Sequence, residues 1–150
     1  MYILQGMSSD WSEVRNLIST LADKILKSET EMDSQALGNA LYGLQSMNSI
    51  HAEVRNLVAA LAKEIGESSP TLSIQSIGSA LYGLQKMSSE SLEVRALLAA
   101  LSEKIEASDV TLDAQAVGNA LFGLQRMSSN NAEVRSLIQA ITGKLLKAGG

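Results

Sequence analysis

The residue types best suited to catalysis or metal binding are scarce in this sequence and are not grouped. Its 150 residues include one histidine, His51, and no cysteine, so no thiolate can act as a nucleophile or as a metal ligand. The acidic residues lie mostly at the ends and outer faces of expected helices, where carboxylates serve as caps or as solvated charge. No cluster has metal-ligand spacing or the pairing that acid–base chemistry needs. We therefore expect a non-enzymatic chain with no metal and no cofactor, and we interpret His51 as a surface residue.

Aromatic and amide side chains recur at a fixed spacing, and the chemistry they offer is recognition by stacking and hydrogen bonding. Tyr2, Tyr42, Tyr82 and Phe122 are each 40 residues apart. A ladder of rings would suit nucleobases or planar side chains, and it would equally suit packing of one repeat against the next. The sequence leaves both interpretations open. The candidate RNA- or ligand-binding residues, which share one helix face with the rings, are Gln35, Asn39, Tyr42, Gln75, Ser79, Tyr82, Lys86, Gln115, Asn119, Phe122 and Arg126.

These residues belong to a 40-residue repeat that has no insertions. Glu-Val-Arg begins at positions 13, 53, 93 and 133, and Gly-x-Ala-Leu-aromatic-Gly-Leu-Gln begins at positions 38, 78 and 118. We expect a single domain, 1–150, with units at approximately 1–30 (partial), 31–70, 71–110 and 111–150. Because the chain begins inside a unit, we interpret it as a segment of a longer array.

Each unit is predicted to contain two helices. The first should span 33–47, 73–87 and 113–127, with Asp33, Ser73 and Asp113 as N-caps. The second should begin near positions 10, 50, 90 and 130, where a residue three positions before Glu13, Glu93 or Glu133 would form a capping box, and where Ser49 would be the cap in one unit. Its apolar positions form a single stripe at helical spacing: Val54, Leu57, Val58, Leu61 and Ile65. The expected fold is all-α, a right-handed α-solenoid of about four two-helix repeats with the first truncated.

Three further recurring residue types have structural explanations. Two glycines inside each first helix cost about 1 kcal/mol apiece relative to alanine, which favours close approach of neighbouring helices. The glutamine that recurs at 5, 45, 85 and 125 is predicted to form a hydrogen-bonded ladder between units. The arginine that recurs at 15, 55, 95 and 135 is predicted to tie units together through an ion pair or a carbonyl contact.

Composition limits the possible partners. The net charge of −4 does not favour phosphate binding by the chain as a whole, although Lys86 and Arg126 add positive charge to the candidate face. No apolar run approaches the ~18 residues of a membrane span. We expect a soluble intracellular protein, cytoplasmic or organellar, with no membrane partner.

The segment 112–124 followed by Glu133, Val134 and Leu137 resembles the octotricopeptide repeat and its FAST-kinase-like relatives. Asn39 and Asn119 match the asparagine of that family's short core motif, whereas Ser79 departs from it. Tyr42, Tyr82 and Phe122 stand at its tryptophan position. The resemblance implies an α-solenoid and suggests sequence-tuned RNA binding. The family's proline-rich stretch with a tryptophan is absent.

Two functions from different classes remain. One is binding of single-stranded RNA along the first helices, and the alternative is a protein–protein interaction scaffold that takes a peptide or a partner protein. Because the sequence contains no clear capping units, we also expect end-to-end self-association through the terminal repeats.

Overall fold

The computed structural model describes residues 7–28, 32–67, 73–109 and 111–149. Within these ranges the chain is all-helical and contains no strand. Tyr2 and Gln5 lie outside the described residues. The helices are α1 (Ser12–Lys27), α2 (Ser34–Tyr42), α3 (Ala52–Glu67), α4 (Ile74–Tyr82), α5 (Leu92–Ala107), α6 (Ala114–Gly123) and α7 (Ala132–Gly149).

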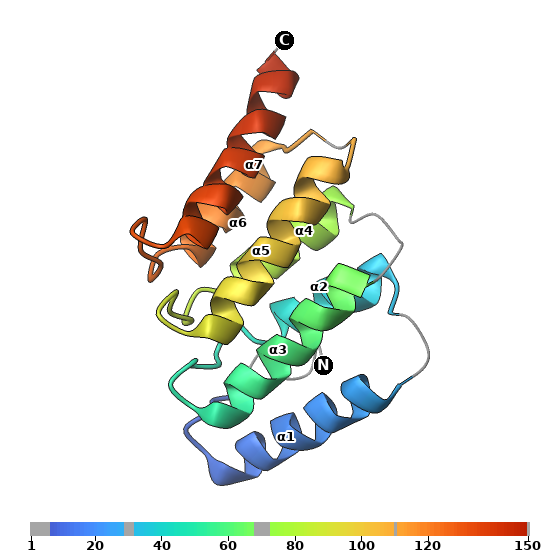
Figure 1. Ribbon diagram of the computed structural model, residues 1–150, viewed down its shortest axis with the longest axis vertical. Coiled ribbons are helices and arrows are strands. Elements are labelled where there is room, and N and C mark those ends of the chain that lie inside the picture. The colour runs from blue at the N-terminus through green and yellow to red at the C-terminus, as the bar shows by residue number, and fades with distance from the viewer. Residues whose placement is uncertain (1–6, 29–31, 68–72, 110, 150) are drawn as a thin grey trace.

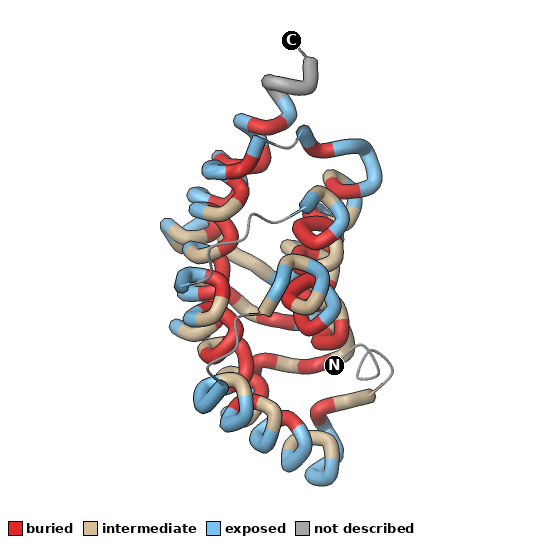
Figure 2. Tube along the Cα trace, turned by 90° about the vertical axis from the view of Figure 1, so that its right-hand side faces the viewer, coloured by how far each residue is buried: buried red, intermediate tan, exposed pale blue. Residues whose placement is uncertain are grey.

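The helices form two layers that run along the molecule (Figure 1). The second helices of the units, α1, α3, α5 and α7, pack side by side in chain order, and the first helices, α2, α4 and α6, do the same behind them. Figure 2 shows that the buried residues face the space between the layers. The predicted stripe on α3, from Val54 to Ile65, is fully buried, as are Leu37, Leu41 and Leu44 in the other layer. None of the described helices is long and apolar enough to cross a membrane.

The first helices begin where the sequence predicts and end earlier. The side chains of Asp33, Ser73 and Asp113 accept hydrogen bonds from the amides three residues on, at 2.8, 3.1 and 2.8 Å, which confirms the N-caps. The predicted ends at 47, 87 and 127 are wrong, because the α-helices stop at Tyr42, Tyr82 and Gly123. The chain continues in tighter turns that contain hydrogen bonds from an amide to the carbonyl three residues back, such as Leu44 N–H to Leu41 O and Met47 N–H to Leu44 O.

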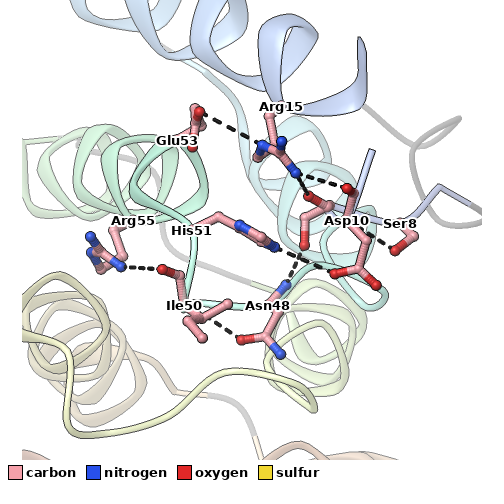
Figure 3. A network of polar contacts seen from close by, with 9 residues as sticks. Ser8, Asp10, Arg15, Asn48, Ile50, His51, Glu53 and Arg55 are labelled. Carbon is pink, nitrogen blue, oxygen red and sulfur yellow. Dashed lines mark hydrogen bonds and ion pairs between the residues drawn. The ribbon is translucent and has the colours of Figure 1, made fainter. Parts of the chain in front are cut away.

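The second helices start two residues later than predicted, and the capping box is wrong for α1 and α5. Their N-caps are Trp11 and Ser91, and neither side chain accepts a capping hydrogen bond. The recurring arginine holds the preceding loop instead. Arg15 donates to Ser9 O and Asp10 O, both at 2.9 Å (Figure 3). Arg55 likewise donates to Ser49 O at 2.9 Å and to Ile50 O at 2.8 Å. These carbonyl contacts stay within one unit, and the predicted tie between units occurs instead as an ion pair at one junction, between Arg15 and Glu53.

Other polar contacts cross between units. The buried hydroxyls of Ser9, Ser49 and Ser89 accept hydrogen bonds from the amides of Asn48, Ser88 and Ser128 at 2.8–2.9 Å. The proposed cap at Ser49 is thus wrong, because its hydroxyl serves the next unit. The glutamine ladder is confirmed at one junction, where Gln125 Nε2 donates to Gln85 O at 3.3 Å.

The first two units meet through two additional polar contacts. His51 Nε2 lies 3.4 Å from Asp10 Oδ1, and Arg15 Nε lies 3.9 Å from Glu53 Oε2 (Figure 3). His51 is therefore part of a junction between units rather than a bare surface residue, which the sequence alone did not indicate.

The paired glycines allow the first helices to approach closely, as predicted. A Cβ at Gly83 would overlap with the carbonyl oxygen of Leu41, and one at Gly123 would overlap with that of Leu81. A Cβ at Gly38 would lie 3.0 Å from Ser76 Cα. The second glycine of a unit therefore meets the preceding unit, and the first meets the following one. Gly118 has nothing within 4 Å, because no described helix follows α6 in this layer.

Gly83→Ala should destabilise the protein, because the added methyl group must push α4 away from the Leu41 carbonyl. Overpacking of this kind costs roughly 1–3 kcal/mol, and Gly83 is the C-cap residue of α4, so no gain in helix-interior propensity offsets this cost. Urea denaturation would measure the change in the free energy of unfolding. Gly118→Ala is the matched control and should stabilise by about 0.5–1 kcal/mol. Equal effects of the two substitutions would contradict the close-approach explanation.

Candidate functional site

The recurring aromatic rings stack on one another. The ring centroids of Tyr42 and Tyr82 are 5.5 Å apart with the planes at 22°, and those of Tyr82 and Phe122 are 5.3 Å apart at 14°. Stacked bases lie about 3.4 Å apart, so inserting one between two rings would need roughly 7 Å. The faces of Tyr82 are therefore occupied by its neighbours, and a ligand meets mainly ring edges. The rings therefore pack against one another, as one of the two interpretations predicted. Phe122, the last ring, is still 45% exposed.

A polar groove runs between α4 and α6 on the side of the first-helix layer that bears the rings. Its volume is about 650 Å³. Gln75 and Ser79 on α4 face Gln115 and Asn119 on α6 across it, and its lining includes both tyrosine rings, Tyr42 and Tyr82. Six of the predicted candidate residues therefore come together in one place.

A second groove of about 370 Å³ separates α2 from α4. Gln35 and Asn39 line it from α2, while Gln75 and Ser79 line it from α4. Gln75 and Ser79 are thus shared by both grooves. The equivalent amide and hydroxyl positions of three successive units form one continuous polar face, which we call the amide face: Gln35, Asn39, Gln75, Ser79, Gln115 and Asn119.

Three of the predicted candidates do not line either groove. Lys86 and Arg126 are exposed and follow α4 and α6 rather than lying within them. Phe122 belongs to the ring stack. The positive charge expected on the candidate face is therefore placed beyond the ends of the helices that carry the amides.

Serines at the helix starts also line the second groove, and they were not among the residues predicted from the sequence. Ser76 Oγ donates to Ser34 O at 2.9 Å, and Ser34 Oγ lies 3.0 Å from Ser76 Oγ. Ser34 Oγ also accepts from Ser73 N–H at 3.1 Å. These hydroxyls are engaged with one another, so the amides are better placed to contact a ligand. The available signal was the small residue that recurs at 36, 76 and 116, which marks a close approach of neighbouring helices.

Carboxylates shape the electrostatics of the grooves. Asp113 lines the larger groove while capping α6, and Asp33 caps α2 in the same way. A capping carboxylate offsets the positive end of the helix dipole. Neither of these helix starts is therefore suited to hold an anion. The grooves favour neutral hydrogen-bonding groups over phosphate.

No arrangement for covalent or metal chemistry is evident in the described part of the chain. Groups of three or more His, Asp or Glu side chains that could hold a metal ion do not occur among these residues. The chemistry that the grooves offer is hydrogen bonding by amides, since each amide presents both a donor and an acceptor.

Comparison with known proteins adds no relative: no family model, no curated protein and no solved structure matches this chain. The resemblance to the octotricopeptide repeat therefore rests on the residues of this sequence alone.

Tyr82→Ala should destabilise the protein about twice as much as Phe122→Ala. Tyr82 loses two ring–ring contacts and Phe122 loses one, and each is worth roughly 0.5–1.5 kcal/mol beyond its buried area. Thermal or urea unfolding of both variants would measure this. Tyr82→Phe is the control and should change stability little, because Phe122 fills the same position without a hydroxyl. A larger loss at Phe122 than at Tyr82 would contradict the stacked ladder.

Proposed function

We propose that this chain is a right-handed α-solenoid that binds single-stranded RNA along the amide face and catalyses no reaction. The in-register packing of α1, α3, α5 and α7, and of α2, α4 and α6, supports the solenoid. The segment of resemblance points to the same architecture and to the same class of ligand.

One observation carries the RNA proposal: each of the three complete units presents a glutamine and an asparagine or serine at the same two positions of its first helix. Amides pair with the edges of bases through a donor and an acceptor together. Helical-repeat proteins read single-stranded RNA at one base per repeat with two or three side chains. The change from Asn39 to Ser79 to Asn119 on a constant framework is the kind of variation that such reading requires.

The rings and the cations take secondary parts in this proposal. Tyr42 and Tyr82 line the larger groove, so a base in that groove contacts the rings from the side instead of inserting between them. Lys86 and Arg126 contact phosphates at the margin of the amide face. With two such contacts, log Kd should change with log salt concentration by a slope of only about 1.4, since each phosphate contact on a single strand contributes ~0.7.

A peptide-binding scaffold is the second candidate, and the carboxylates favour it. Asp113 lines the larger groove, and the cations among the candidates, Lys86 and Arg126, do not line it. Amide side chains also pair with peptide N–H and C=O groups, so the same face would hold an extended peptide.

Gln75→Ala should weaken RNA binding roughly tenfold, because Gln75 lines both grooves and a good base contact is worth about 1–3 kcal/mol. The measurement is binding to a randomised single-stranded RNA pool over a salt series that starts at low ionic strength. Asn56→Ala is the matched control, an exposed amide on α3 in the other layer, and should bind normally. Absence of binding at the lowest salt concentration would refute the RNA proposal. Gln75-dependent binding to a peptide library would then support the scaffold.

Ser79→Asn should change which RNA sequences are enriched, at one position only, because it gives the third unit the amide that the second and fourth units carry. Selection from the same pool with both proteins would show this. Asn56→Ser, on the other layer, should leave the enriched sequences unchanged. If Ser79→Asn alters affinity without altering sequence preference, the amide face does not read bases.

A further inference from the structure

The C-terminal end of the first-helix layer exposes a surface that is buried at every earlier junction. Leu121 on α6 is 70% exposed, whereas the equivalent Leu41 is 1% exposed and Leu81 is fully buried. Gly118 has open space around it, whereas Gly38 faces Ser76 of the next unit. The end of α6 therefore retains the surface of a junction without a helix upon it.

The C-terminal end of the other layer repeats this pattern. Ile138 on α7 is 44% exposed, and Thr142, one turn further on, is exposed. The residues at the Ile138 position in the three earlier units are completely buried: Ile18, Val58 and Leu98. Those at the Thr142 position are also buried: Ala22, Ala62 and Ser102. We call Ile138 and Thr142 the C-terminal face, because these residues lie in the same layer as α1.

The N-terminal end exposes a different stripe, on α1. Leu17 is 40% exposed, although its equivalents Leu57, Leu97 and Leu137 are completely buried. Thr20 is also exposed, whereas Ala60 and Ala140 at its position are buried. Leu137 is buried in the last unit, where no described helix follows, so this stripe faces the preceding unit. We call Leu17 and Thr20 the N-terminal face.

From these two faces we infer that the C-terminal face of one copy binds the N-terminal face of a second copy, head to tail. The argument is continuity with the junctions inside the chain: α3 packs on α5, and α5 on α7, through the same two stripes. In this arrangement α1 of the second copy packs on α7 of the first copy, in the same way that α7 packs on α5 within one chain.

Polar groups at the two ends are compatible with this pairing. Each internal junction joins a serine hydroxyl to an amide 39 residues further on, as Ser89 Oγ accepts from Ser128 N–H. Ser129, the last serine of this set, is exposed. Ser8 occupies the same repeat position as Ser128, so Ser8 N–H of a second copy would donate to Ser129 Oγ. The hydroxyls of Thr20 and Thr142 donate to Asn16 O at 3.0 Å and to Ile138 O at 2.8 Å, so burying them leaves no donor unpaired.

This pairing joins two different faces, so it does not close after two copies. Each added copy presents a fresh C-terminal face, and association is open-ended. No described helix of the second copy corresponds to one that would follow α6, so the amide face is interrupted where two copies meet. The inference does not depend on what the amide face binds.

Sedimentation velocity or light scattering over a concentration series tests it. The mass-average molar mass should exceed that of one chain, and it should rise with concentration without levelling off at the molar mass of a dimer. Trp11, the single tryptophan, is exposed beside the N-terminal face, so its emission should shift to shorter wavelength over the same range. A strict monomer at the highest concentration overturns the inference.

Two variants separate head-to-tail pairing from symmetric pairing. Leu17→Glu blocks the N-terminal face and Ile138→Glu blocks the C-terminal face, so each protein alone should be monomeric. Their equimolar mixture should form dimers and nothing larger, because one intact face remains on each partner. Dimers of either variant alone would show that like faces pair, and would overturn the head-to-tail arrangement.

Controls exclude unfolding and general surface effects. Leu92→Glu replaces an equally large apolar residue at a position that is exposed in all four units, and it should associate like the parent chain. If Leu17→Glu or Ile138→Glu loses its helical circular dichroism, the experiment is repeated with Thr20→Glu and Thr142→Glu. Both threonines are exposed, so these substitutions should not unfold the protein. Association that persists in these variants counts against the inference.

Discussion

The rest of this structure depends on a close backbone–backbone contact between neighbouring first helices, which requires a glycine because no Cβ fits there. The carbonyls of Leu41 and Leu81 occupy the space where a Cβ on Gly83 and Gly123 would stand. This contact fixes the separation of α2, α4 and α6, and the separation brings the rings to 5.3–5.5 Å from one another. Backbone packed on backbone explains why glycine recurs at the C-terminal ends of these helices.

The same contact determines what the exposed side of this layer can bind. Helices this close leave shallow grooves between them instead of a deep pocket. The apolar residues of the first helices point toward the other layer, so amides and hydroxyls remain on the outside. Ligand pockets for drug-sized molecules are usually concave and mostly apolar. The grooves instead suit an extended polymer with polar groups at regular intervals.

Features that depend on the spacing of residues along the chain could be predicted from the sequence. Features that depend on contacts between particular atoms could not. The N-caps, the stripe from Val54 to Ile65 and the close glycines all followed from spacing. The helix ends near Tyr42 and Tyr82 did not, because tight turns and α-helix share one residue pattern. The role of Ser49 was missed for a related reason, since a serine near a helix start is equally suited to capping and to a contact with a neighbouring unit. The grouping of the amides was predicted, whereas the mutual occupation of the ring faces required three-dimensional distances.

The arrangement of junctions also constrains how such a chain can change in length. The closest packing in each layer joins a helix to its counterpart 40 residues away. A duplicated or deleted block of 40 residues would restore every junction, because each unit meets its neighbours in the same register. A single inserted residue within α4 would rotate everything beyond it on that helix by about 100°, and would turn Gly83 away from the Leu41 carbonyl. Gene rearrangements that preserve whole units are therefore the tolerated route to longer or shorter relatives of this protein.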